Sequence, residues 1–269
     1  MNSKARRVAF AIAAHPDDIE FMMAGTLLLL KNAGYEIHYM NLSRGNCGSI
    51  VTDSPTTARI RLQEAKQAAK ILGAHFHPPI CNDLEIFYDL KTLRKLAGAI
   101  REAKPTILLT HSPADYMEDH MNTCRLAVTA AFTRGMPNFK SIPARATGEY
   151  DCTIYHSLPH SLTDNLRRPI VPGAFVNTSS VHAKKVEALK AHQSQQSWLD
   201  ASQKMNSYLQ MCDAISLRVG LLSKKFKHAE GWRRHLHFGF CDEKADPLRV
   251  LGKDYLVNEK YERALRMDF

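Results

Sequence analysis

The segment that most constrains this chain is Ala14–Asp18, which reads Ala-His-Pro-Asp-Asp and directly follows the apolar run Val8–Ala13. An apolar run that ends in polar, titratable residues is typical of a buried parallel strand that delivers them to its carboxyl end. In open α/β sheets, ligands bind at that edge. A histidine and two carboxylates near a strand end could supply metal ligands and a general base together. This pattern predicts a functional site at the sheet edge.

Strands and helices alternate along the first half of the chain. Glycine follows two of the predicted helices directly or nearly so, at Gly34 and Gly73, as it does where helices end. The predicted elements are, in order, a strand at 8–13, a helix at 21–32, a strand at 35–42, a helix at 56–72, a short strand near His75, a helix at 90–103 and a strand at 105–110. This alternation predicts an α/β fold with a mostly parallel sheet and helices on both faces.

The second half of the chain has a less regular pattern. It predicts helices at 121–132, 181–191 and 204–222, a strand at 150–155 and a proline-containing loop at 157–172. Neither an internal repeat nor a low-complexity linker divides the sequence. We therefore expect one domain over residues 1–269, with a carboxyl-terminal extension from about residue 200.

The charge of the chain favours anionic partners. Its formal net charge is +9, which suits phosphorylated substrates, nucleic acid or an acidic surface. The basic residues are spread out, however, and only Lys224–Lys227 and Arg233–Arg234 form small clusters of the kind found on solvated faces. We expect no nucleic-acid partner and a small-molecule substrate.

Cysteine spacing and hydropathy indicate the compartment. The six cysteines are widely separated and form no C-x-x-C pair, which favours reduced thiols in a reducing compartment. The amino terminus lacks the long apolar region and cleavage site of a signal peptide. No segment approaches the roughly 20 apolar residues of a membrane span. The sequence predicts a soluble, cytoplasmic protein.

A second polar strand end follows Thr110 and runs from His111 to His120. If its strand is a neighbour of the first, the two loops meet at one edge of the sheet. His15, Asp18 and His120 would then supply the three protein ligands of a catalytic zinc site, which leaves one position for water. The remaining carboxylate, Asp17, could take a proton from that water.

Helix capping is the alternative for the carboxylates in these loops. Aspartate is among the preferred residues at helix amino termini, and Asp17, Asp18 and Asp119 all stand where a helix could begin. Capping explains any one of them alone, whereas it does not explain two histidine-containing motifs at two strand ends.

The two motifs together resemble those of the PIG-L/LmbE-like zinc-dependent de-N-acetylases, which have His-Pro-Asp-Asp after the first strand and, in some members, Asp-Tyr-x-x-Asp-His after a later one. Residues 61–73, 185–195 and 229–234 also resemble segments of that family, so the similarity covers most of the chain. It implies a Rossmann-like fold, hydrolysis of an N-acetyl group to acetate and a free amine, and a trimer or hexamer. It also implies a divalent ion, usually Zn²⁺, on His15, Asp18 and His120, with Asp17 as the general base.

One position departs from the pattern of several relatives. They have His-Pro-Asp-His where this chain has Met117-Glu-Asp-His120. In those relatives the first histidine stabilises the oxyanion or protonates the leaving amine, and a methionine side chain can do neither. The resemblance therefore implies either that another group takes over the role, with Tyr116, Asp115 and His192 as the candidates, or that the role is weakened in this chain.

Two further residues have roles implied by the resemblance. Arg61 matches an arginine that binds the carbonyl oxygen or a substrate anion. Asp119 could hold the ring of His120, as carboxylates behind metal ligands do. His111 lies at a strand end near the proposed site, where a direct role is open. Eight further histidines have no assignable partner and are expected at the surface or in the core: His75, His77, His156, His160, His182, His228, His235 and His237.

The sequence therefore predicts a metal-dependent hydrolase that removes the N-acetyl group from an N-acetylglucosamine-type sugar conjugate. Two alternatives stay open. One is an amidase that cleaves a larger acyl or thiol conjugate with the same metal site. The other is a non-catalytic sugar- or nucleotide-binding protein on the same fold.

Overall fold

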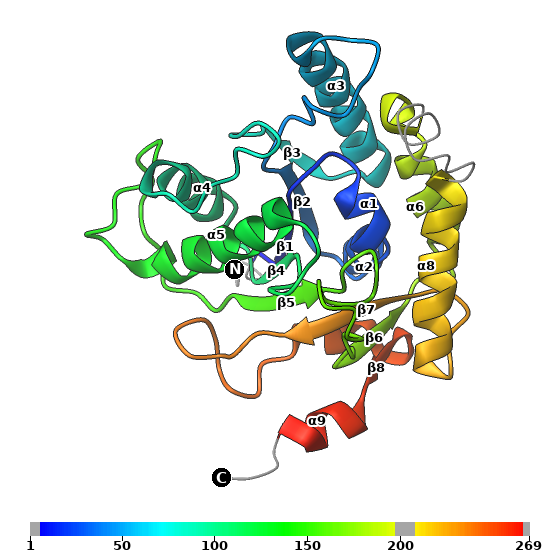
Figure 1. The fold of residues 1–269 in the computed structure, drawn as a ribbon. Coiled ribbons are helices and arrows are strands. Elements are labelled where there is room, and N and C mark those ends of the chain that lie inside the picture. The colour runs from blue at the N-terminus through cyan, green and yellow to red at the C-terminus, as the bar shows by residue number, and fades with distance from the viewer. Residues whose placement is uncertain (1–5, 197–207, 266–269) are drawn as a thin grey trace.

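The computed structural model describes residues 6–196 and 208–265. One eight-stranded sheet runs through them in the order β3-β2-β1-β4-β5-β7-β6-β8 (Figure 1). The strands from β3 to β5 are parallel, and β7, β6 and β8 continue the sheet in antiparallel pairs. The strands are β1 (Val8–Ala13), β2 (Glu36–Asn41), β3 (His75–His77), β4 (Ile107–Thr110), β5 (Thr153–Ser157), β6 (Ala174–Asn177), β7 (Ala229–Arg234) and β8 (Tyr255–Val257).

Helices cover both faces of the sheet, as the sequence predicts (Figure 1). One face carries α1 (Asp18–Met22), α2 (Ala24–Asn32), α3 (Ser54–Leu72), α6 (His182–Leu189) and α8 (Tyr208–Ser223). The other face carries α4 (Leu90–Ala103) and α5 (Glu118–Phe132). The remaining elements are two 3₁₀ segments, η1 (Thr133–Gly135) and η2 (Pro247–Asp254), and the last helix, α9 (Glu259–Leu265).

Strand β1 lies between the two layers and is buried along its whole length. Because side chains alternate across a strand, Ala9, Ala11 and Ala13 pack under α1 and α2, while Phe10 and Ile12 pack under α4 and α5. Because the run at 8–13 is apolar at every position, the strand presents apolar side chains to both faces of the sheet. The strand thus fixes where the polar residues behind it emerge.

The predicted strands and helices of the first half are confirmed, with one difference. The helix expected at 21–32 begins earlier, at Asp18, and is divided at Met23 into α1 and α2. The division leaves the backbone amides of Gly25 and Thr26 free to bind a side chain, and the carboxylate of Glu230 accepts both. In the second half, the strand expected at 150–155 lies at 153–157, and residues 204–207 of the helix expected at 204–222 lie outside the described residues.

Glu230 on β7 joins three elements through one buried carboxylate. It accepts hydrogen bonds from the amides of Gly25 and Thr26 at 2.8 Å each and from the Thr26 hydroxyl at 2.7 Å. It also forms an ion pair with Lys185 of α6, at 2.8 Å between Nζ and Oε1. Trp232 donates its indole N–H to the same Thr26 hydroxyl. The segments at 185–195 and 229–234 therefore meet in one structural network.

All six cysteines are free thiols in the structure.

Among the helices formed by residues 6–196 and 208–265, none combines the length and the apolar character that a bilayer span requires.

Replacing Glu230 by glutamine should destabilise the fold by about 3–5 kcal/mol, because it leaves the ammonium group of Lys185 buried without a counter-charge. The measurement is the free energy of unfolding from urea titration. Glu187→Gln, which removes half of an exposed ion pair with Lys184, is the control and should change stability by less than about 1 kcal/mol. Equal stability of the two variants would contradict the assigned role of Glu230.

Candidate active site

The two polar strand ends meet because β1 and β4 are parallel neighbours, with Ile12 opposite Thr110. The turn after β1 supplies His15, the first residue of α1 is Asp18, and the first turn of α5 supplies His120. One ligand atom from each of these three residues lies within 4.8 Å of the others, and all three residues are buried. The structure thus brings together the three residues that the sequence names as metal ligands.

Asp18 is the centre of this group. Its Oδ1 lies 3.4 Å from Nε2 of His120, and its Oδ2 lies 3.4 Å from Nδ1 of His15. Burial alone would raise the pKa of Asp18, but the positive charges of His120 and His111 hold it well below its usual range. Ligand atoms on a tetrahedral zinc ion are separated by about 3.3 Å, so the donor set fits such an ion.

The second ring nitrogen of each histidine is held by a carboxylate. Nε2 of His15 lies 2.9 Å from Oδ2 of Asp119, and Nδ1 of His120 lies 3.1 Å from Oδ1 of Asp115. Such carboxylate–histidine pairs orient the ring and set the tautomer that binds a metal. The hydrogen bonds to Asp119 and Asp18 outweigh the effect of burial and raise the pKa of His15 to about 10, so the site as it stands favours positive charge.

These pairs correct two expectations. Asp119 holds His15 and not His120, because successive helical residues such as 119 and 120 point in directions about 100° apart. Asp115 is buried against His120 and does not line the cavity, so its position does not match the expected contact with substrate.

Asp17 lies beside the three-residue group and is not part of it. Its backbone has φ 107°, a left-handed conformation that costs a non-glycine residue about 1–3 kcal/mol and is found at functional sites. Its side chain does not cap α1. Instead its Oδ2 accepts a hydrogen bond from the Tyr208 hydroxyl at 2.7 Å and lies 3.7 Å from Nη2 of Arg61. Burial raises the pKa of Asp17 to about 6, although the charge of Arg61 acts in the opposite direction.

Arg61 reaches the site from α3 and is almost fully buried. Its Nη2 donates to the carbonyl of Pro16 at 2.6 Å, within the turn that carries the motif. Two glycines of the loop after β2 make room for it. A Cβ at Gly45, where φ is +71°, or at Gly48 would come within 2.7–2.9 Å of the Arg61 side chain. The loop therefore needs glycine where the guanidinium passes.

A cavity of about 610 Å³ opens over these residues. It is lined by Asp17, Asp18 and Arg61, and Tyr116, which is half-exposed, lies at its rim. His192 does not line it: this residue is fully buried, with Nε2 3.4 Å from Glu20 of α1. Its expected contact with substrate therefore does not match its position.

His160 lines the cavity, although no motif or residue spacing predicts it there. It follows β5, and its Nε2 lies 3.5 Å from Oδ1 of Asp18, with its ring edge-on to His120 at 5.7 Å. Burial lowers the pKa of His160 to about 4. Met117 also lines the cavity but offers no polar hydrogen. His160 lies at the site because β5 is the neighbour of β4 in the sheet. The hydrophobic periodicity of the sequence does not reveal this strand order, so it could not link His160 to the site.

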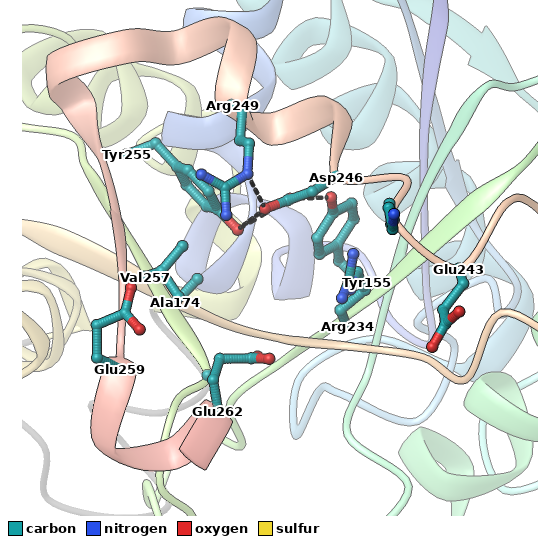
Figure 2. Close-up of a pocket in the computed structure, with 12 residues that line it drawn as sticks. Tyr155, Ala174, Arg234, Glu243, Asp246, Arg249, Tyr255, Val257, Glu259 and Glu262 are labelled. Carbon is teal, nitrogen blue, oxygen red and sulfur yellow. Dashed lines mark hydrogen bonds and ion pairs between the residues drawn. The ribbon is translucent and has the colours of Figure 1, made fainter. Parts of the chain in front are cut away.

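A second cavity, of about 550 Å³, lies near β6, β8 and α9 (Figure 2). Figure 2 shows Asp246 among the residues that line it. Asp246 accepts hydrogen bonds from the hydroxyls of Tyr155 and Tyr255 and pairs with Arg249. No histidine or cysteine lines it among the described residues. The chemistry of a hydrolytic metal centre is thus concentrated in the first cavity.

Comparison with known proteins identifies the family. The family model described as "PIG-L: GlcNAc-PI de-N-acetylase" matches residues 10–132. Diacetylchitobiose deacetylase of Thermococcus kodakarensis is 30% identical over 193 residues, which are 68% of this chain and 68% of that protein. The chain belongs to the PIG-L de-N-acetylase family.

Two further proteins show the range of this similarity. 4-Oxalmesaconate hydratase of Pseudomonas putida is 28% identical over 193 residues, 69% of this chain and 72% of that protein. The solved structure of N,N'-diacetylchitobiose deacetylase from Pyrococcus horikoshii superposes with a TM-score of 0.72 at 22% identity, over 86% of this chain and 85% of that one. This likeness confirms the predicted α/β fold with a mostly parallel sheet.

Alanine at His15 or at His120 should each reduce the number of tightly bound zinc ions per chain by one, because either change removes a ligand from a three-residue set. The measurement is metal content after gel filtration in metal-free buffer. His237→Ala, outside both cavities, is the control. Unchanged metal content in both site variants would place the ion elsewhere.

Proposed function

We propose that this chain is a zinc-dependent hydrolase that removes the N-acetyl group from an N-acetylglucosamine-type sugar conjugate and releases acetate and a free amine. One observation carries the proposal: a donor set of His15, Asp18 and His120 lies beside Asp17, a separate buried carboxylate that lines the same cavity. Membership of the PIG-L family, whose relatives include a diacetylchitobiose deacetylase, supports it.

The donor chemistry fits a divalent cation. Two imidazoles and one carboxylate converge, and the ion-pair partners of Asp18 within the described chain are all imidazoles, so no lysine or arginine takes the place of an ion. When bound, such an ion polarises the acetyl carbonyl and lowers the pKa of a water molecule. Another divalent metal with the same ligand preferences would serve as well.

Asp17 acts as the general base in this proposal. It takes a proton from the water whose oxygen attacks the acetyl carbon, and the amine nitrogen gains a proton as the C–N bond breaks. The Tyr208 hydroxyl, at 2.7 Å, holds the carboxylate in place and leaves its other oxygen for the proton. Arg61 fixes the turn through its hydrogen bond to the carbonyl of Pro16. In this proposal its positive charge, beside Asp17, also acts on the carbonyl of the acetyl group.

His160 supplies the imidazole that is missing at Met117. Its Nε2 is buried in the cavity and has no hydrogen-bond partner, so a neutral ring can donate an N–H to the oxyanion that forms on the acetyl group. Tyr116 stays a candidate for substrate contact at the rim. Assembly into a trimer or hexamer, which the family resemblance implies, also stays a prediction.

Replacing Asp17 by asparagine should lower deacetylation roughly 100- to 10,000-fold while zinc content stays that of the wild type, because the amide cannot accept the proton and is not a ligand. The assay measures acetate and free amine from diacetylchitobiose and from other N-acetylglucosamine conjugates. Glu187→Gln is the matched carboxylate control on the surface. Full turnover by Asp17→Asn would remove Asp17 from the mechanism.

Gly48→Ala should lower turnover about 10- to 100-fold with little change in stability, because the new methyl group displaces only the ends of the Arg61 and Gln195 side chains. The measurements are kcat/KM and the melting temperature. Gly135→Ala is the control, since its Cβ would meet only an ordinary contact at 3.6 Å. Wild-type turnover in Gly48→Ala would show that the position of the guanidinium is immaterial to the reaction.

A second candidate function is the addition of water to an unsaturated acid, favoured by the similarity to the Pseudomonas putida hydratase. The substrate panel therefore includes 4-oxalmesaconate alongside the N-acetylated sugars. It also includes larger acyl and thiol conjugates, which test the amidase alternative. Turnover of 4-oxalmesaconate without release of acetate from any sugar would replace the deacetylase proposal. No turnover at all in a zinc-loaded protein would favour a binding protein.

A further inference from the structure

Three side chains from distant parts of the sequence meet outside the active site. His182 is the first residue of α6, Asp213 lies on α8, and His228 immediately precedes β7. Nε2 of His182 lies 2.9 Å from Oδ1 of Asp213, and Nε2 of His228 lies 3.2 Å from the same oxygen. The two rings stack with centroids 3.9 Å apart and planes 10° apart. Both imidazoles thus direct Nε2 at one point.

The separations of these atoms match a small cation. All three ligand atoms lie within 4.8 Å of one another, and zinc bonds of about 2.0–2.1 Å in tetrahedral geometry separate ligand atoms by about 3.3 Å. The two imidazoles are nearly buried, whereas the side chain of Asp213 is 47% exposed. An ion could therefore enter from the Asp213 side and keep a water molecule as its fourth ligand.

The charges around the group also suit a metal ion. Lys185 does not neutralise Asp213, because its ammonium group is bound to Glu230. The ion-pair partners of Asp213 in the described part of the chain are the two imidazoles.

Another group of two histidines and a carboxylate has a cationic side chain bound to its carboxylate. Glu36, His38 and His75 also place their ligand atoms within 4.8 Å of one another. There, however, the guanidinium of Arg6 binds both oxygens of Glu36, and the side chain of His75 is 64% exposed. Arg6 thus already supplies the positive charge that an ion would bring to that group.

We propose that His182, Asp213 and His228 form a second divalent-cation site, of the zinc type, which ties α6, α8 and β7 together. The ion would also support the active site. Helix α8 begins with Tyr208, whose hydroxyl binds Asp17, and Asp213 lies about 7.5 Å further along the helix axis. A cation on Asp213 therefore fixes the helix that holds Asp17.

The test is the number of zinc ions bound per chain. The full-length protein is stripped with a chelator, loaded with ZnCl₂, passed through gel filtration in metal-free buffer and analysed for zinc. We expect about two ions in the wild type, and about one in Asp213→Asn, in the His182→Ala/His228→Ala pair and in the His15→Ala/His120→Ala pair. His75→Ala is the control and should keep two. Asp213→Asn is half-exposed and isosteric, so it should fold even where the paired variant does not.

A second readout isolates the new site from the proposed function. In the His15→Ala/His120→Ala variant, ZnCl₂ should still raise the melting temperature, and adding Asp213→Asn to that variant should abolish the rise. Two ions retained by Asp213→Asn, or no zinc-dependent shift in the His15→Ala/His120→Ala variant, would overturn the proposal. The deacetylase proposal would stand in either event, since it depends on the ion at His15 and His120.

Discussion

The buried carboxylate of Asp18 is the constraint on which the site depends. A carboxylate removed from water needs positive charge or hydrogen-bond donors, and here the side chains that approach it are imidazoles. His15, His160 and the pair His111 and His120 come from three segments of the chain, which follow β1, β5 and β4, so the sheet edge must bring these segments together. Imidazole nitrogens balance a carboxylate only by holding protons, and a bound cation supplies the same charge while leaving them neutral.

Glu230 solves the same physical problem in a different way. Its carboxylate is fully satisfied by Lys185, by two helix amides and by a hydroxyl, so nothing is left for a ligand. Asp18 faces a cavity of about 610 Å³, whereas Glu230 is closed off within the packing of α2, α6 and β7. This contrast favours Asp18 as the proposed metal ligand and Glu230 as part of the scaffold.

The sequence predicts the parallel half of the sheet and the core of the site because both have local patterns. Strands buried on both faces are continuous apolar runs, and His15, Asp17 and Asp18 directly follow one of them. The short strands β6 and β8, and the charged β7, carry no such pattern, and they form by pairing with one another and with β5. Tyr208 reaches the cavity from α8, which packs on β7, and His160 follows β5, so neither could be assigned from residue spacing.

The proposed active-site residues come from both halves of the chain. The family model covers residues 10–132, which include the three proposed ligands, Asp17 and Arg61. His160 and Tyr208 lie beyond it, yet one faces Asp18 and the other binds Asp17. The second half of the chain therefore supplies neighbours of the proposed general base and of Asp18, while the first half carries the proposed metal ligands.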